Sequence, residues 1–444
     1  MKNKFKEEYK RKFLSLEDAA QLIRSGDIIV GPLAMGEPVG LLKAIGRRAV
    51  AGEFDNVEYI AQGPIYSYDW LKPEADGHMR SNSMFILEPL SRKALAEGRS
   101  DFTPCHGGEV PVTICDWMIN KYEHPKVKVV ADVSPMDDHG YFSFGTSPSF
   151  ITEPARQDNT IVILEINKHQ PRVYGDNFIH ISEVDHLVEN DHELISVPSP
   201  PTTPEDEAIA GAIAEMVEDG STIQLGIGGM PNVLGKLLES KKNLGAHTEM
   251  IGDAFMHLWE AGVLTGKLKT IHPRKIVATF ILASKACYDW ANENPAIEMY
   301  SQHYTNDPYV IAKNYKLVAI NQALEVDLTG QVCSESIGTR QYSGMGGQFH
   351  FTQAAQRSLG GKAFICLYST ANTKEGTVSK VVPILKPGAA VTTLRTDVQY
   401  IATEYGIAQL KGKSIRQRAL ELISIAHPEF RNSLRTEASK LGLI

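Results

Sequence analysis

Glu249 is the residue of this sequence best placed to do covalent chemistry. It lies in Gly245-Ala246-His247-Thr248-Glu249-Met250, and glycine-dense loops occur on both sides of it in the chain: Gly226-Ile227-Gly228-Gly229 and Ser343-Gly344-Met345-Gly346-Gly347-Gln348. Because glycine has no side chain, backbone N–H groups in such loops can approach a ligand closely and hold an oxyanion or a phosphate. A carboxylate facing such amides predicts acyl chemistry with Glu249 as the nucleophile.

The first glycine loop is also compatible with a dinucleotide-binding fingerprint. It follows an apolar strand, and Glu249 comes about 20 residues later, where an acid that binds a ribose would stand. However, Pro231 replaces the third glycine of that fingerprint, and proline suits the first turn of a helix better than a pyrophosphate crossing. We therefore rank an NAD-binding oxidoreductase below acyl chemistry, and a purely structural turn stays open for this loop.

The second loop has three glycines within the four positions 344–347, which predicts a nest of backbone amides for an oxyanion. A flexible surface turn is the alternative. Asp137-Asp138-His139-Gly140 is better explained as a polar turn than as a metal site, because adjacent residues rarely converge on one ion. We expect no metal, and the sequence has no Walker lysine motif, His-Glu-x-x-His or Gly-x-Ser-x-Gly elbow.

Composition excludes several classes of protein. With 444 residues the chain exceeds the usual size of one hydrophobic core, so two domains are expected. The net charge of −8 argues against nucleic acid as a partner. No apolar run is long enough for a signal peptide or a membrane span, so we expect a cytoplasmic protein without a membrane partner. Five cysteines without a Cys-x-x-Cys pair predict reduced thiols.

An internal duplication organises the chain. Ser15 and Thr203 each precede a helical pattern that is followed by a glycine, a short apolar strand, a glycine-containing turn and a proline that opens another helix. Further apolar strands are expected at 160–164, 275–278 and 363–367. The fold class is therefore α/β, with two tandem, similar open domains and mainly parallel sheets. The proline-rich stretch around residues 197–204 places the boundary between domains 1–197 and 198–444.

These motifs together resemble the acetyl-CoA hydrolase/transferase family of CoA-transferases, which includes butyryl-CoA:acetate and 4-hydroxybutyrate CoA-transferases. Val133-Ser134-Pro135, Val173-Tyr174-Gly175-Asp176 and Ala426-His427-Pro428-Glu429-Phe430 extend the resemblance over nearly the whole chain. It implies a NagB-like CoA-transferase architecture and a ping-pong reaction through a glutamyl-CoA thioester on Glu249. An acyl-CoA hydrolase that uses the same nucleophile is the alternative activity.

The resemblance also implies partners and site residues. Coenzyme A would be a cosubstrate with no permanently bound cofactor, the other substrates would be small carboxylic acids, and the chain would form a homo-oligomer, either a dimer or a tetramer. Two residues depart from the family pattern: His350 stands where many members have Asp, and Leu33 where some have His. The residues implied to bind CoA or the oxyanion are Gly346, Gly347, Gly344, Gln348, Gln224, Gly226, Gly228 and Gly229, and those implied to line the substrate pocket are Glu37, His106 and His350.

Overall fold

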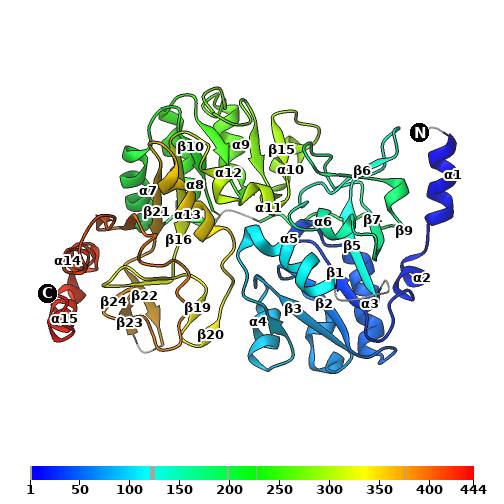
Figure 1. Ribbon diagram of the computed structural model, residues 1–444, viewed down its shortest axis with the longest axis horizontal. Coiled ribbons are helices and arrows are strands. Elements are labelled where there is room, and N and C mark those ends of the chain that lie inside the picture. Colours follow the sequence, from blue (N-terminus) through cyan, green and yellow to red (C-terminus); the bar gives the residue numbers. More distant parts are fainter. Residues whose placement is uncertain (1–2, 121–125, 198–199, 227, 375) are drawn as a thin grey trace. The chain divides into compact units, whose positions relative to one another are not determined.

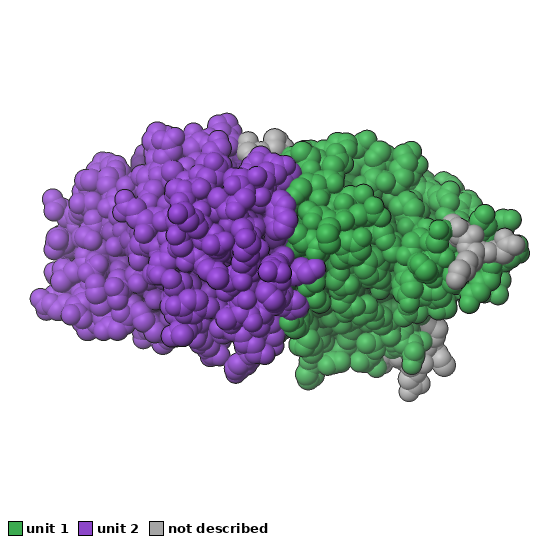
Figure 2. Space-filling model, turned by 90° about the horizontal axis from the view of Figure 1, so that it is seen from above, with its two compact units in different colours: residues 1–197, 277–305 green, residues 198–276, 306–444 purple. Residues whose placement is uncertain are grey.

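A computed structural model describes residues 3–120, 126–197, 200–226, 228–374 and 376–444. The chain forms two compact units (Figure 2). Unit 1 contains residues 1–197 and 277–305, and unit 2 contains residues 198–276 and 306–444. The expected domains, 1–197 and 198–444, did not include this return of residues 277–305 to the first unit. Pro198 and Ser199 of the expected linker lie outside the described residues.

Unit 1 is built on a parallel sheet with the strand order β4-β3-β2-β1-β5-β7-β9 (Figure 1). Its strands are β1 (Ile28–Val30), β2 (Val57–Ala61), β3 (Met79–Ser83), β4 (Asp101–Phe102), β5 (Val127–Val133), β7 (Thr160–Ile166) and β9 (His186–Glu189), with β6 (Tyr141–Ser143) and β8 (Phe178–His180) paired apart from the sheet. Its helices are α1 (Asn3–Lys12), α2 (Leu16–Ala20), α3 (Val39–Val50), α4 (Pro89–Ala96), α5 (Val110–Val112), α6 (Thr152–Ala155), α10 (Lys285–Ala291) and α11 (Gln302–Thr305), with a π-helix at Thr113–Ile119.

Unit 2 repeats this plan with the neighbouring strands β11-β10-β16-β21-β25-β26, of which only β25 and β26 pair antiparallel. These strands are β10 (Thr222–Gln224), β11 (Gly245–His247), β16 (Leu317–Gln322), β21 (Lys362–Cys366), β25 (Tyr400–Thr403) and β26 (Gly406–Gln409). Its helices are α7 (Pro204–Met216), α8 (Gly229–Leu237), α9 (Asp253–Glu260), α12 (Pro308–Ile311), α13 (Gln348–Arg357), α14 (Ile415–Ile425) and α15 (Pro428–Lys440).

Further short strands complete the structure. They are β12 (Met250–Ile251), β13 (Ile276–Ala278), β14 (Phe280–Ile281), β15 (Ile297–Met299), β17 (Glu325–Asp327), β18 (Val332–Cys333), β19 (Ser336–Ile337), β20 (Arg340–Gln341), β22 (Thr370–Thr373), β23 (Gly376–Ser379) and β24 (Val381–Val382).

The predicted duplication is confirmed at the level of strand register. In unit 1, Val30 at the end of β1 pairs with Val129 of β5, and Val129 pairs with Val162 of β7. In unit 2, Gln224 at the end of β10 pairs with Ala319 of β16, and Ala319 pairs with Ala363 of β21. In both units the chain leaves the central strand for one side of the sheet and later returns on the other side. Such a switch point is where open α/β sheets bind ligands, beyond the carboxyl ends of the strands.

Local sequence signals explain where helices begin. The Thr203 side chain accepts a hydrogen bond from the Asp206 amide and Pro204 opens α7, as the sequence predicts. Ser15 likewise caps α2, although this helix ends at Ala20, before the expected stop at Gly26. The five cysteines are free thiols, four of them buried. No helix of the described residues is long and apolar enough to cross a bilayer.

Candidate functional site

Glu249 lies just beyond the carboxyl end of β11 and before α9, in unit 2. The preceding strand is completely buried, and so is Thr248. The Thr248 hydroxyl donates to the carbonyl of Met250 at 3.0 Å, which fixes the turn that carries the glutamate. Glu249 itself is densely surrounded by protein atoms but keeps part of its surface exposed. The nucleophile predicted from sequence therefore sits on a rigid strand end and stays accessible.

Two amides from distant segments hold the carboxylate of Glu249. The Asn306 side-chain amide donates to Oε1 at 2.8 Å, and the backbone N–H of Gly347 donates to Oε2 at 3.2 Å. Burial raises the pKa of the Glu249 carboxyl above its ordinary value. These two hydrogen bonds lower the pKa in part, so that the net shift is upward. The carboxylate is thus partly desolvated, which favours nucleophilic attack, while the two amides favour its ionised form and orient it.

The second glycine loop is shaped around this contact. A Cβ atom on Gly347 would lie 2.9 Å from both Glu249 Oε2 and Asn306 Nδ2, so a larger residue would have to displace these groups. The neighbouring Gly346 has a φ angle of +55°, in the left-handed region that favours glycine. The structure therefore brings Gly347 to the predicted nucleophile, with Gly346 beside it in the chain, and it makes a plain surface turn a poor explanation for this loop.

Asn306 was not identified from the sequence, because no motif surrounds it and it lies 57 residues from Glu249. Asn306 is completely buried. The side-chain Oδ1 atom accepts no hydrogen bond from the described residues. Asp307 follows directly and caps α12 by accepting from the Tyr309 amide at 2.7 Å. The helix cap fixes the backbone beside Asn306 and so helps to direct its amide toward the glutamate.

The other residues predicted for this site from the second loop and the start of α13 are buried. The Gln348 amide donates to the hydroxyls of Ser334 and Thr393, at 2.9 and 3.3 Å, and so ties the start of α13 to the segments before β19 and before β25. His350 is buried on α13 beside the ring of Phe349. Gly344 is buried at the start of the glycine run. Their predicted roles toward CoA remain predictions, and the contacts of Gln348 are structural.

The first glycine loop leads into α8. Gly228 caps this helix with a φ angle of +126°, Gly229 is its first residue, and Gly226 is half-buried; Ile227 lies outside the described residues. Gln224 accepts from the Ile320 amide at 3.1 Å, so its side chain bridges β10 and β16 at the switch point. The dinucleotide hypothesis required Glu249 to bind the ribose of a nucleotide held by this first loop. The Glu249 carboxylate instead accepts a hydrogen bond from Gly347 of the second loop.

Glu37 and His106, the remaining predicted pocket residues, belong to unit 1. Glu37 is completely buried and accepts from the Ile65 amide at 2.7 Å and the Tyr68 hydroxyl at 2.8 Å. Burial raises the pKa of Glu37 to about 8, although these hydrogen bonds lower it. His106 is half-buried at the start of a 3₁₀ turn, Gly107–Glu109. Roles for both in binding the acceptor carboxylate remain predictions.

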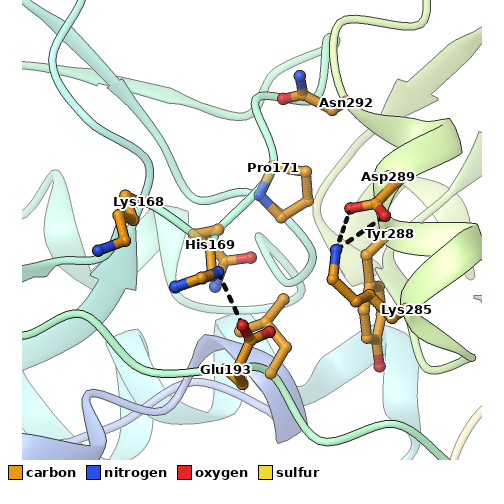
Figure 3. A pocket seen from close by; sticks show the side chains of 10 residues that line it. Lys168, His169, Pro171, Glu193, Lys285, Tyr288, Asp289 and Asn292 are labelled. Carbon is orange, nitrogen blue, oxygen red and sulfur yellow. Dashed lines mark hydrogen bonds and ion pairs between the residues drawn. The ribbon is translucent and has the colours of Figure 1, made fainter.

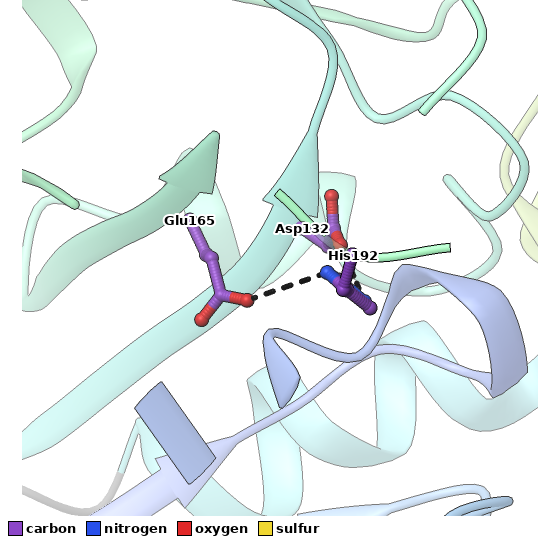
Figure 4. Close-up of side chains that lie close together, drawn as sticks. All are labelled: Asp132, Glu165 and His192. Atoms are coloured by element: carbon purple, nitrogen blue, oxygen red, sulfur yellow. Dashed lines mark ion pairs between the residues drawn. The ribbon is translucent and has the colours of Figure 1, made fainter. Parts of the chain in front are cut away.

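A second cluster of charged groups in unit 1 joins Asp132, Glu165 and His192 (Figure 4). Asp132 faces Nε2 of the imidazole at 3.3 Å, whereas Glu165 faces Nδ1 at 3.9 Å. The two carboxylates thus face different nitrogens of the imidazole, and one ligand atom from each of the three residues lies within 4.8 Å of the other two. Glu165 also accepts from the amides of Gly40 and Leu41, so it serves to cap α3.

Unit 1 also has a surface pocket of about 280 Å³ lined by charged side chains (Figure 3). Lys285 pairs with both oxygens of Asp289 at 2.8 Å, and His169 lies 3.4 Å from Glu193. Lys168 pairs with Asp191 at 2.7 Å. The charged side chains of this pocket are already paired with oppositely charged neighbours. We therefore assign the pocket no part in the chemistry predicted for Glu249.

Comparison with known proteins identifies the family of the chain. The model of the acetyl-CoA hydrolase/transferase N-terminal domain matches residues 1–198, and that of the C-terminal domain matches residues 283–438. The 4-hydroxybutyrate coenzyme A transferase of Clostridium kluyveri is 43% identical over 98% of this chain and 99% of its own. The succinyl-CoA:cyclohexane-1-carboxylate CoA transferase of Geobacter metallireducens is also 43% identical, over 100% of this chain and 98% of its own.

Among solved structures, RipA from Yersinia pestis superposes with a TM-score of 0.92 at 34% identity, covering 99% of this chain and all of RipA. The similarity therefore includes both units and the segments that carry Glu249, Asn306 and Gly347. With family models matching most of its length and relatives matching nearly all of it, the chain belongs to the acetyl-CoA hydrolase/transferase family.

Proposed function

We propose that this CoA-transferase moves coenzyme A between a short-chain acyl-CoA and a carboxylate such as acetate, through a thioester on Glu249. Butyryl-, propionyl- and 4-hydroxybutyryl-CoA are the proposed donors. The observation that carries the proposal is the carboxylate of Glu249, partly desolvated and held between the amides of Asn306 and Gly347. A carboxylate in that setting is a nucleophile with hydrogen-bond donors already in place.

The reaction divides into four displacements. The Glu249 carboxylate attacks the acyl-CoA carbonyl, which gives an acyl-glutamyl anhydride and releases CoA thiolate. The thiolate then attacks the glutamyl carbonyl, which gives glutamyl-CoA and releases the first carboxylate. Acetate attacks this thioester to form a second anhydride and thiolate, and the thiolate attacks the acetyl carbonyl to release acetyl-CoA. Glu249 is then a free carboxylate again.

The two amides have a defined task in these steps. When thiolate attacks the glutamyl carbonyl, negative charge develops on an oxygen of the Glu249 side chain. In the resting site these oxygens already lie 2.8 and 3.2 Å from the amide nitrogens of Asn306 and Gly347. Donors placed in advance stabilise such charge without reorganisation, which is where enzymes gain most of their rate.

A panel of donors and acceptors tests the proposal. Purified protein is given each acyl-CoA with acetate, butyrate, 4-hydroxybutyrate, succinate or cyclohexane-1-carboxylate, and both new acyl-CoA and free CoA are measured. Transfer predicts acyl-CoA product in proportion to donor consumed, with little free CoA. Release of free CoA at the same rate with and without acceptor would instead identify a hydrolase, which is the competing activity for the same nucleophile.

A further inference from the structure

The cluster of Asp132, Glu165 and His192 in unit 1 has no part in the reaction steps described above (Figure 4). Asp132 of β5 and Glu165 of β7 are paired in the register of these parallel strands, so both side chains point to the same face of the sheet. Both residues are completely buried. Two acids therefore lie side by side in the interior, where like charges repel each other strongly.

The polar atoms of this cluster are not all paired. Among the described residues no Lys or Arg forms an ion pair with Asp132 or Glu165, and His192 makes the ion-pair contacts of both acids. Oδ1 of Asp132 accepts no hydrogen bond from the described residues, and Nε2 of the imidazole has no hydrogen-bond partner there either. Buried polar atoms are nearly always paired, so two unpaired atoms in one cluster point to a ligand.

The separation of Asp132 and His192 distinguishes a metal ion from a shared proton. Nε2 of the imidazole lies 3.3 Å from Oδ2 of the carboxylate. A hydrogen bond between an ionised nitrogen and a carboxylate oxygen is about 2.7–2.9 Å long. Two ligands that bind one zinc ion at about 2.0–2.1 Å in tetrahedral geometry lie about 3.3–3.4 Å apart. The observed separation therefore fits two ligands of one ion better than a shared proton.

Neighbouring amides leave Nε2 as the available ligand atom of His192. The side-chain nitrogen of Asn167 lies 3.1 Å from Oδ2 of Asp132 and 3.0 Å from the His192 carbonyl. The same nitrogen is 3.1 Å from Nδ1, but its two hydrogens are donated to those two oxygens. We therefore assign the imidazole hydrogen to Nδ1, which donates to the Asn190 carbonyl at 3.3 Å. A metal-binding histidine usually makes such a hydrogen bond through its other nitrogen.

Glu165 can serve as a third ligand while it caps α3. It accepts three hydrogen bonds, which come from the amides of Gly40 and Leu41 and from the side chain of Asn190. A carboxylate has about four acceptor sites, so one remains for an ion. The three donors also fix the orientation of the carboxylate, as hydrogen bonds around a metal ligand do.

We propose that Asp132, Glu165 and His192 bind one divalent transition-metal ion, with zinc as the best match. Zinc binds imidazole nitrogen and carboxylate oxygen, and three protein ligands leave a position for water. The His192 side chain is 17% exposed, which gives the ion a path from solvent. The ion is structural, because it ties the segment after β9 to β5 and β7. No local motif marks the three residues, which explains why the sequence predicts no metal.

Metal titration of the full-length protein tests the proposal. The purified protein is treated with a chelator and then titrated with Zn²⁺, Mn²⁺ or Co²⁺, and bound metal and melting temperature are measured. We expect about one ion per chain. The melting temperature should rise with metal concentration, because an ion that binds only the folded state stabilises it. The Co²⁺ complex should show the visible absorption of a four-coordinate site.

Two variants connect the metal to these side chains. Asp132→Asn keeps the size of the side chain but removes its charge, and His192→Gln removes the nitrogen ligand from a residue that lies outside the strands. Both should bind metal at least roughly ten- to a hundredfold more weakly, which is the cost of losing even a hydrogen-bond partner of a ligand. His169→Gln is the matched control, because His169 is a partly exposed histidine of the same unit that faces Glu193.

His192→Gln alone decides the question if Asp132→Asn does not fold. Binding of none of the three metals by the wild type would overturn the proposal, and so would equal binding by the wild type and His192→Gln. Neither result bears on the proposed function, because Glu249 belongs to the other unit and its CoA adduct is measured separately.

Discussion

The side-chain amide of Asn306 lies 2.8 Å from Oε1 of Glu249, and the backbone amide of Gly347 approaches the other oxygen of the same carboxylate. One residue is 57 positions after the glutamate and the other is 98 positions after it. The glutamate therefore depends on two separate segments of unit 2 for its orientation and its charge.

Replacing Asn306 by Ala should slow turnover and shift its pH dependence. The amide lowers the pKa of Glu249, so its loss leaves burial to raise that pKa further. Since the ionised carboxylate is the nucleophile, activity rises with pH through this pKa, and the rising limb of the kcat/KM profile should move to higher pH in Asn306→Ala. We expect kcat to fall on the order of 10²-fold at the optimum.

The exposed Asn432 of α15 provides the control for this change. Asn432→Ala should leave both the rate and the pH profile as they are. A profile that stays in place in Asn306→Ala, whatever the loss of rate, would mean that the amide does not act on the charge of Glu249.

Adding a methyl group at Gly347 should disable the site with little effect on the fold. The new Cβ would lie 2.9 Å from Glu249 Oε2 and from Asn306 Nδ2, so the amide has to move away from the carboxylate. Turnover in Gly347→Ala should fall on the order of 10²-fold or more. Gly346→Ala should act similarly, because alanine is strained at a φ angle of +55°.

Gly211 is a suitable control, because it lies in α7 and a Cβ there would meet no atom within 4 Å. Gly211→Ala should be fully active and at least as stable as the wild type. Normal turnover in stable preparations of both loop variants would remove the second glycine loop from the reaction.

Glu37 should make the stability of the protein depend on pH. Burial raises its pKa to about 8 in the folded state, against an ordinary value of 4.5. Between these two values the folded state holds a proton that the unfolded state releases, so stability falls as pH rises. The slope is at most about 1.4 kcal/mol per pH unit. Chemical denaturation of Glu37→Gln should show a smaller fall between pH 5 and 8 (roughly that window) than the wild type.

The exposed Glu74 allows a matched comparison, since Glu74→Gln removes the same charge from the surface of unit 1. Its pH dependence should equal that of the wild type. Parallel curves for Glu37→Gln and wild type would show that Glu37 is ionised in the folded protein, and the assignment of a neutral buried carboxyl would then be wrong.

The sequence predicted the parts of the site that carry a local signature. Glu249, Gly346 and Gly347 stand in glycine-rich motifs, because close backbone approach requires residues without side chains. Asn306 has no such signature: its position follows from packing of α12 and α13, which no short pattern encodes. The duplicated strand–turn–helix unit was likewise visible from spacing. In contrast, no local motif marks the return of residues 277–305 to unit 1, because this return depends on tertiary contacts.

The role of Gln224 shows the same limit. The family resemblance implies a place for Gln224 near the nucleophile, and that stays a prediction. The contact that the structure gives joins β10 to β16, because the Gln224 side chain accepts from the Ile320 amide. A polar side chain at a strand end forms hydrogen bonds with the backbone groups that the neighbouring strand leaves unpaired. Which strand is the neighbour cannot be read from a local motif.

Removing the nucleophilic oxygen while keeping size and shape should abolish transfer. Glu249→Gln retains hydrogen-bonding capacity toward Asn306 and Gly347 but is not a carboxylate. We expect turnover near the detection limit with unchanged folding, by circular dichroism, and retained CoA binding, by calorimetry. The matched variant Glu239→Gln alters an exposed glutamate of the same unit and should be fully active. Substantial activity in Glu249→Gln would refute the covalent role.

The most direct measurement is the mass of the enzyme after incubation with acyl-CoA and no acceptor. We expect a CoA-sized increment on the peptide that contains Glu249, absent in Glu249→Gln, and its discharge as acetyl-CoA when acetate is added. An adduct on another residue, or one that forms equally well in Glu249→Gln, would show that Glu249 is not the nucleophile.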